Sequence, residues 1–152
     1  MKIRTDFVTN SSSSSFILGF KSEDEIDEIW KSLPSYLSLD CIRDVISDIK
    51  NGVTSKEAAL ELYSNSIWEF DYEYDHCDSF SFTRSRKDRD TEEYQRGYKA
   101  WKKSKVDKLA GDLEEYDILS IVEYEDHTDF GATMEHDVMP GLSATVRRIS
   151  HH

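Results

Sequence analysis

The sequence has few cysteines and no long apolar run. These absences argue against a disulfide-rich exported protein and against a membrane-spanning protein. Its two cysteines, Cys41 and Cys77, can form at most one disulfide. Because residues 1–8 lack the apolar segment of an export signal, we expect both thiols to stay reduced in the cytoplasm. No stretch approaches the roughly 20 apolar residues that span a bilayer, so we expect no membrane partner.

Basic residues are also scarce, with 19 Lys and Arg against 31 Asp and Glu, which gives a net charge of −12. This acidity argues against general binding to nucleic acid, and we expect another protein as the partner. The exception is the segment from Arg84 to Lys108, where ten basic residues outnumber five acidic ones. Such a band could support a homo-oligomer or bind an acidic partner, or it could be one solvated helix face.

Four helices are predicted from apolar residues at helical spacing. The expected segments are residues 22–33, 40–51, 54–63 and 90–115. Ser22 with Glu25, and Thr54 with Glu57, have the spacing of capping boxes at helix starts. In the last segment, the apolar residues before and after residues 103–105 do not fall on the same face of one straight helix. This segment could therefore be one bent helix or two helices.

The remaining apolar segments predict strands. They are residues 16–20, 68–74, 80–82, 117–125 and 144–149. Residues 118–122 carry apolar side chains on both faces, which indicates a central strand. Helices and strands are partly segregated, so we predict one α+β domain over residues 1–152. Its sheet is expected to be antiparallel or mixed, with about four to five strands packed by helices on one side.

One predicted strand carries a row of acidic side chains. Glu69, Asp71, Glu73 and Asp75 alternate with aromatic residues, so they would point to one side of the strand about 6.6 Å apart. This spacing roughly copies that of nucleic-acid phosphates, and the row could be an interaction face that mimics DNA. It could equally be the solvated face of a sheet.

A run of five serines, Ser11, Ser12, Ser13, Ser14 and Ser15, follows Asn10 and is bracketed by apolar residues. Its hydroxyl and N–H groups could hold an anion, although the glycines and lysine of a phosphate loop are missing. A serine nucleophile with His136 as base lacks the usual strand-to-helix elbow pattern. The alternative is a structural turn in which Asn10 and the serines satisfy local backbone groups.

The stretch from Phe7 to Phe16, with Asn10 and the serines inside it, resembles the opening of a group of proteins from Firmicutes and their phages. Part of that group is also similar near the C-terminus, over Met134–His136 and Arg147–His152. Similar proteins carry an acidic residue where this chain has Phe130. The group has no established activity, so the resemblance implies a bacterial or phage source and kinship, not a function. Distinctive residues at both ends predict that strands 16–20 and 144–149 pair.

Acidic and histidine side chains near the C-terminus predict a candidate metal site. The set is Asp126, Asp129, Glu135, His136, His151 and His152. Carboxylate and imidazole ligands suit Zn²⁺ or Mn²⁺ better than calcium alone. The same residues could be ordinary surface groups, and the terminal His-His could derive from a purification tag.

Two functions therefore stay open. The first is a binding or regulatory module without chemistry. The second is a small divalent-metal-dependent enzyme, of the hydrolase kind, with its site near Glu135 and His136. The incomplete catalytic pattern favours the first.

Overall fold

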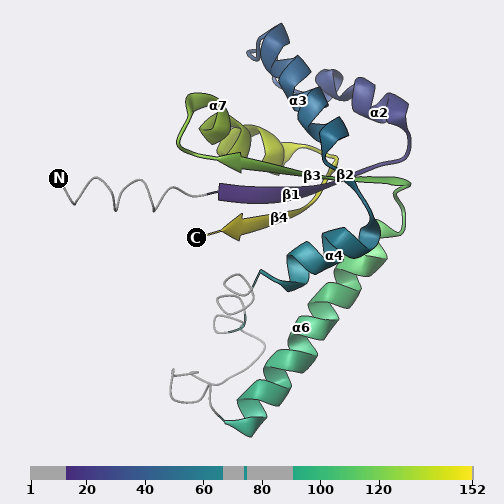
Figure 1. Ribbon diagram of the computed structural model, residues 1–152, viewed down its shortest axis with the longest axis vertical. Helices are drawn as coiled ribbons and strands as arrows, with labels where there is room; N and C mark the ends of the chain where they lie inside the picture. Colours follow the sequence, from purple (N-terminus) through teal and green to yellow (C-terminus); the bar gives the residue numbers. More distant parts are fainter. Residues whose placement is uncertain (1–12, 67–73, 75–90, 152) are drawn as a thin grey trace, which may run out of the picture.

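The structure is a computed structural model that describes residues 13–66, 74 and 91–151. Its centre is a four-stranded antiparallel sheet with strand order β2-β3-β1-β4 (Figure 1). The strands are β1 (Ser13–Phe20), β2 (Val53–Thr54), β3 (Ile118–Glu125) and β4 (Thr145–His151). The helices are α2 (Glu23–Asp27), η1 (Ile29–Ser32), α3 (Leu39–Asn51), α4 (Lys56–Ser64), α6 (Glu92–Leu113), α7 (Asp129–Ala132), η3 (Thr133–Val138) and η4 (Met139–Gly141). The α+β fold class is therefore confirmed.

Strand β1 lies inside the sheet and supplies side chains to two hydrophobic cores. It pairs with β3 along one edge and with β4 along the other. Because side chains alternate along a strand, Phe16 and Leu18 enter one core whereas Ile17 enters the other. Each of these three side chains is fully buried.

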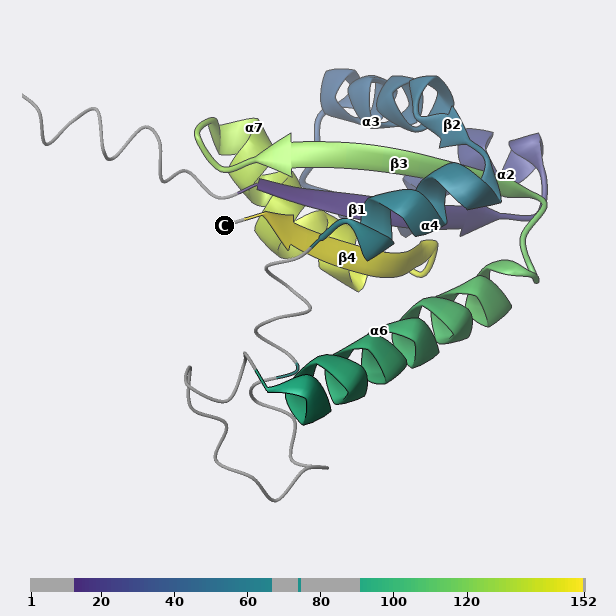
Figure 2. The ribbon, with the colours of Figure 1, turned by 60° about the horizontal axis from the view of Figure 1, so that its bottom comes forward.

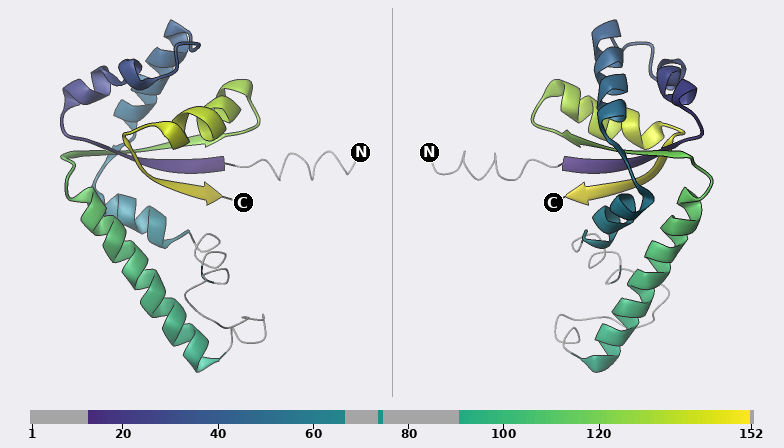
Figure 3. Two further views of the ribbon diagram at one scale, coloured as in Figure 1. Left: turned by 180° about the vertical axis from the view of Figure 1, so that it is seen from behind. Right: turned by 45° about the vertical axis from the view of Figure 1, so that its right-hand side comes forward.

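Helices cover both faces of the sheet, so the prediction of helices on one side is wrong. On one face lie α2, α3 and the α7–η4 segment, and on the other lie α4 and α6 (Figures 1 and 2). Figure 3 shows the sheet between these two layers from two further sides. The cause is visible in β3, where Val122 packs into the first core and Leu119 into the second. A strand that is apolar on both faces needs a cover on each.

Local signals placed most helix boundaries within a few residues. Helix α3 begins after Ser38 and ends at Asn51, just before Gly52, within one residue of the predicted range of 40–51. The predicted cap of α4 is one residue off, because Ser55 and not Thr54 accepts the hydrogen bond from a helix N–H. Thr54 instead pairs with β3. Helix α6 is one continuous helix of 22 residues, and no helix of the described residues is long and apolar enough to cross a membrane.

The predicted hairpin over residues 68–82 lies outside the described residues except for Tyr74. Tyr74 is helical and buried, so the strand prediction is wrong at this position. Its ring packs edge-on against Tyr94 and Tyr98 of α6, with centroids 5.1 and 5.3 Å away. The aromatic stripe of α6 therefore contributes to packing. The acidic row of Glu69, Asp71, Glu73 and Asp75 lies outside the described residues.

The last three serines belong to a strand, and the turn interpretation is wrong for them. Ser13, Ser14 and Ser15 pair in register with both β3 and β4, so their backbone groups are satisfied by the sheet. Asn10, Ser11 and Ser12 lie outside the described residues. Ser13 lies opposite His151, which confirms that strands from the two ends of the chain pair.

Gly52 allows the chain to pass closely beneath β3, and this gives a prediction. A Cβ atom at Gly52 would overlap the carbonyl oxygen of Ile121, whose N–H donates to the Gly52 carbonyl at 2.9 Å. Gly52→Ala should lower the free energy of unfolding by about 2 kcal/mol, the cost of overpacking. Gly111→Ala is the matched control, because nothing lies within 4 Å of its added Cβ. Urea denaturation should show the control stabilised by about 0.5–1 kcal/mol, and equal effects would contradict the close approach.

Candidate metal centre

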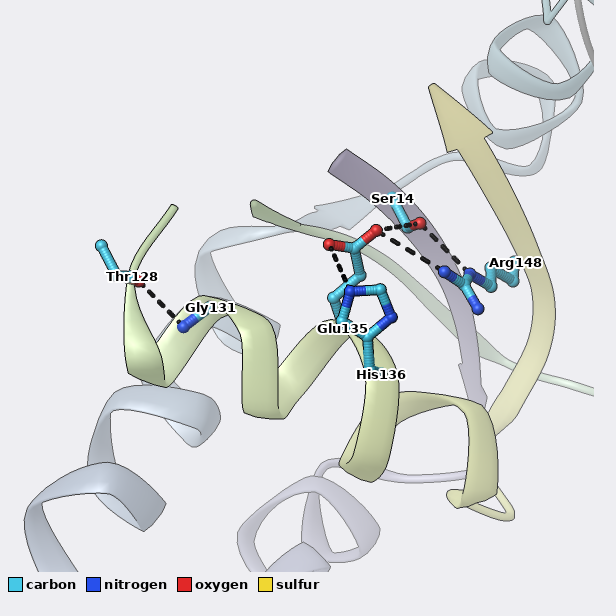
Figure 4. A network of polar contacts seen from close by, with 6 residues as sticks. All are labelled: Ser14, Thr128, Gly131, Glu135, His136 and Arg148. Carbon is cyan, nitrogen blue, oxygen red and sulfur yellow. Dashed lines mark hydrogen bonds and ion pairs between the residues drawn. The ribbon is translucent and has the colours of Figure 1, made fainter. Parts of the chain in front are cut away.

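The candidate site is built on the helical segment that follows β3. Thr128 caps the first turn of α7 by accepting a hydrogen bond from the Gly131 N–H at 2.9 Å (Figure 4). The chain then widens into the π-helical turn η3, which carries Glu135 and His136. Such turns are rare and frequently occur at functional sites. Met134 and Val138 of the same turn are buried in the core and fix its position.

The Glu135 side chain is fully buried and points at the sheet. Ser14 donates a hydrogen bond from its hydroxyl to Oε1 of Glu135 at 2.8 Å. Arg148 places Nη2 3.5 Å from the same oxygen and donates from Nε to the Ser14 hydroxyl at 3.1 Å. A buried carboxylate is costly unless it is paired and hydrogen-bonded. Ser14 and Arg148 meet this requirement together.

The second carboxylate oxygen of Glu135 faces possible metal ligands. Nε2 of His136 lies 3.6 Å from Oε2, and ligand atoms of Asp126, Glu135 and His136 all lie within 4.8 Å of one another. Two ligands about 2.1 Å from a tetrahedral zinc ion stand roughly 3.4 Å apart. The Glu135–His136 pair already has this spacing, and a small movement of Asp126 would complete a three-ligand set.

The structure does not bring every predicted ligand to this cluster. Asp129 is exposed in the first turn of α7 and is not part of the three-residue group. His151 lies on the opposite face of the sheet, and His152 lies outside the described residues. Phe130, the neighbour of Asp129, packs edge-on against the ring of Tyr124, with ring centroids 5.9 Å apart. Phe130 therefore contributes to the packing of the first core.

Tyr124 ties the end of β3 to helix α3. Its hydroxyl donates to the Asp48 carboxylate at 3.0 Å. Burial, and then the charge of Asp48, raise the pKa of the Tyr124 phenol far above its usual range. The phenol therefore stays protonated and keeps donating to Asp48. This hydrogen bond holds the end of β3, just before Asp126.

A second polar cluster lies on the other face of the sheet. The Ser15 hydroxyl is 2.8 Å from Nε2 of His151 and donates to Oε2 of Glu123 at 3.5 Å. Ser15 on β1 therefore links His151 of β4 to Glu123 of β3. Because Ser15 is only 1% exposed, its hydroxyl is a structural link and is poorly placed to attack a substrate.

Sequence reasoning missed the two charged partners of the buried serines. Arg148 lies in a stretch that resembles other proteins, but the sequence pattern assigns no role to Arg148 or Glu123. The signal lay in strand alternation, because Arg148 pairs with Phe16, one step along the same face from Ser14. A basic residue on an otherwise inward-facing strand position predicts a buried acidic partner.

The pairing of Glu135 with Arg148 gives a second prediction. Arg148→Met should lower the free energy of unfolding by about 2 kcal/mol, below the roughly 3–5 kcal/mol seen for fully buried pairs, because Arg148 is partly exposed. The matched control is Arg147→Met, since Arg147 packs over the Tyr63 ring on the opposite face. Denaturant titration should give a clearly smaller loss for the control. A loss at Arg148 no larger than that at Arg147 would contradict the ion pair.

Comparisons with known proteins add no function to this geometry. No protein-family model matches the chain, and no curated protein or solved structure matches it. The resemblance of the chain ends to proteins of Firmicutes and their phages therefore stays a prediction.

Proposed function

We propose that this chain is a non-enzymatic binding module that holds a divalent metal ion, Zn²⁺ or Mn²⁺, between Asp126, Glu135 and His136. The observation that supports this proposal is the convergence of their ligand atoms within 4.8 Å. Two carboxylates and one imidazole are a ligand set that both ions accept. Calcium prefers sites made only of oxygen ligands, and more of them.

The position of the site suggests how the ion would act on the module. Glu135 contacts β1 through Ser14 and β4 through Arg148. An ion bound to its other oxygen would fasten the η3 turn to the loop that contains Asp126. Metal binding is then coupled to the packing of this turn on the sheet, and the folded state gains stability as the ion binds.

We propose that the partner is another protein and that the module works in the cytoplasm. The excess of acidic residues disfavours nucleic acid as a partner. Cys41 is a free thiol, which suits a reducing compartment. Self-association remains a second way to use the basic residues of α6.

The second candidate is a small metal-dependent hydrolase. The observation in its favour is the number of ligands, because three protein ligands leave a coordination position open for water. Against it, the Ser14 hydroxyl is committed to Glu135, so the ion would have to supply the nucleophile. Turnover of an activated ester that chelation abolishes would favour the hydrolase, and its absence in metal-loaded protein would favour the module.

The proposed function predicts metal binding that depends on three side chains. Isothermal titration of untagged protein with Zn²⁺ or Mn²⁺ should show one ion per chain. His136→Ala and Asp126→Asn should each weaken binding at least tenfold, because each removes one ligand. Glu135→Gln should do the same while keeping an oxygen that can accept from Ser14. At 100 times the dissociation constant the ion should stabilise the fold by about 2.7 kcal/mol.

His127→Ala and Asp129→Asn are the matched controls for this titration. Both residues are exposed close to Asp126, His127 in the same loop and Asp129 in the first turn of α7, and both lie outside the three-residue group. They should bind the ion with unchanged affinity. Equal losses in the controls and the ligand variants would point to non-specific surface binding, and uptake of no ion would contradict the proposed function.

A further inference from the structure

Arg148 lies beside the proposed metal position, and its side chain is 35% exposed. We infer that the metal ion and Arg148 together bind a phosphate group, either inorganic phosphate or a phosphate monoester. This inference rests on the proposed function, because the ion supplies half of the binding site. It adds the chemical class of the ligand that the module recognises.

The guanidinium of Arg148 is held in one orientation by three contacts. Nε donates to the hydroxyl of Ser14 at 3.1 Å, and Nη2 faces Oε1 of Glu135 at 3.5 Å. The ring of Phe16 lies under the group, 5.8 Å from its central carbon. A cation that is already fixed loses little freedom when it binds a ligand. These contacts therefore prepare Arg148 for recognition of an anion.

The same contacts leave part of the guanidinium for a ligand. A guanidinium has five N–H donors in a planar fork, and the contacts with described residues use Nε and Nη2. Within residues 13–66, 74 and 91–151, the Nη1 group has no hydrogen-bond acceptor among the interactions of Arg148. Because about a third of the side chain reaches solvent, an oxyanion can approach it.

One carboxylate places the cation and the metal position next to each other. Arg148 contacts Oε1 of Glu135, whereas His136 faces Oε2, so they lie at the two oxygens of the same group (Figure 4). An ion held by Oε2 and His136 therefore sits close to the guanidinium. A phosphate with one oxygen about 2.1 Å from the ion and another about 2.8 Å from a guanidinium nitrogen can bridge them.

The charge of the site makes phosphate binding depend on the ion. Without metal, the carboxylates of Asp126 and Glu135 outweigh Arg148, which leaves a net formal charge of −1. A divalent ion changes this to +1. Because attraction at short range depends on the sign of the local charge, metal-free protein repels a phosphate dianion and metal-loaded protein attracts it. A site of this kind recognises phosphate only after it has bound metal.

The test is isothermal titration of inorganic phosphate into the metal-saturated full chain. We expect the loaded protein to bind one phosphate per chain. Metal-free protein should bind phosphate at least tenfold more weakly. The loaded protein should bind acetate at least tenfold more weakly than phosphate. Arg148→Lys and Arg148→Met should each weaken phosphate binding at least tenfold while metal content stays at one ion per chain. Arg147→Met is the control and should bind as the native chain does. O-phosphoserine, titrated in parallel, shows whether the ligand is an ester or free phosphate.

The outcomes separate the two proposals. Uptake of no metal overturns the proposed function and this inference with it. Uptake of metal without phosphate binding overturns this inference alone, as does equal phosphate binding with and without metal. Unchanged phosphate affinity in both Arg148 variants also overturns it. If either variant loses the ion, comparison of loaded and metal-free native protein still decides whether phosphate binding depends on metal.

Discussion

The buried carboxylate of Glu135 is the constraint on which this end of the molecule depends. A charge removed from water must be paired and hydrogen-bonded, or the fold loses several kcal/mol. Ser14 from the first described strand and Arg148 from the last supply the two partners. The two strands must therefore be neighbours in the sheet, and they are. One polar requirement thus joins segments that lie 134 residues apart in the sequence.

Strand alternation lets the short serine segment serve both faces of the sheet. Ser14 points to the face of Glu135, and Ser15 points to the face of His151 and Glu123. Both polar clusters lie where β1 begins and where β3 and β4 end. The buried apolar residues that follow, from Phe16 onward, hold this polar end in place. The serines consequently act as positioning residues, and the groups suited to bind an ion lie on η3 and in the loop between β3 and α7.

Local sequence patterns predicted most of the helices and strands. They did not predict the contacts between residues that are distant in the sequence. The extent of α3 followed from the spacing of its apolar residues, and the pairing of Phe16–Phe20 with β4 followed from the distinctive residues of the two segments. The serines were misread as a turn because composition does not reveal that two neighbouring strands satisfy their backbones. The chemistry of their side chains identifies Glu135 and His136 from the sequence, whereas the role of Arg148 requires the register of β1 and β4. As a metal ligand, Asp129 is as suitable in sequence as Asp126. In the structure, Asp129 is the first residue of α7 and lies outside the three-residue group that contains Asp126.

The central claim is that an ion binds at Oε2 of Glu135, beside His136, and X-ray diffraction tests it most directly. Crystals grown with Zn²⁺ or Mn²⁺ would be measured above and below the absorption edge of the metal. The claim predicts an anomalous peak about 2.1 Å from Oε2 of Glu135 and Nε2 of His136, with Asp126 as the third ligand. A peak on exposed groups such as His127 and Glu125, or no peak beside Glu135 at saturating metal, would contradict it.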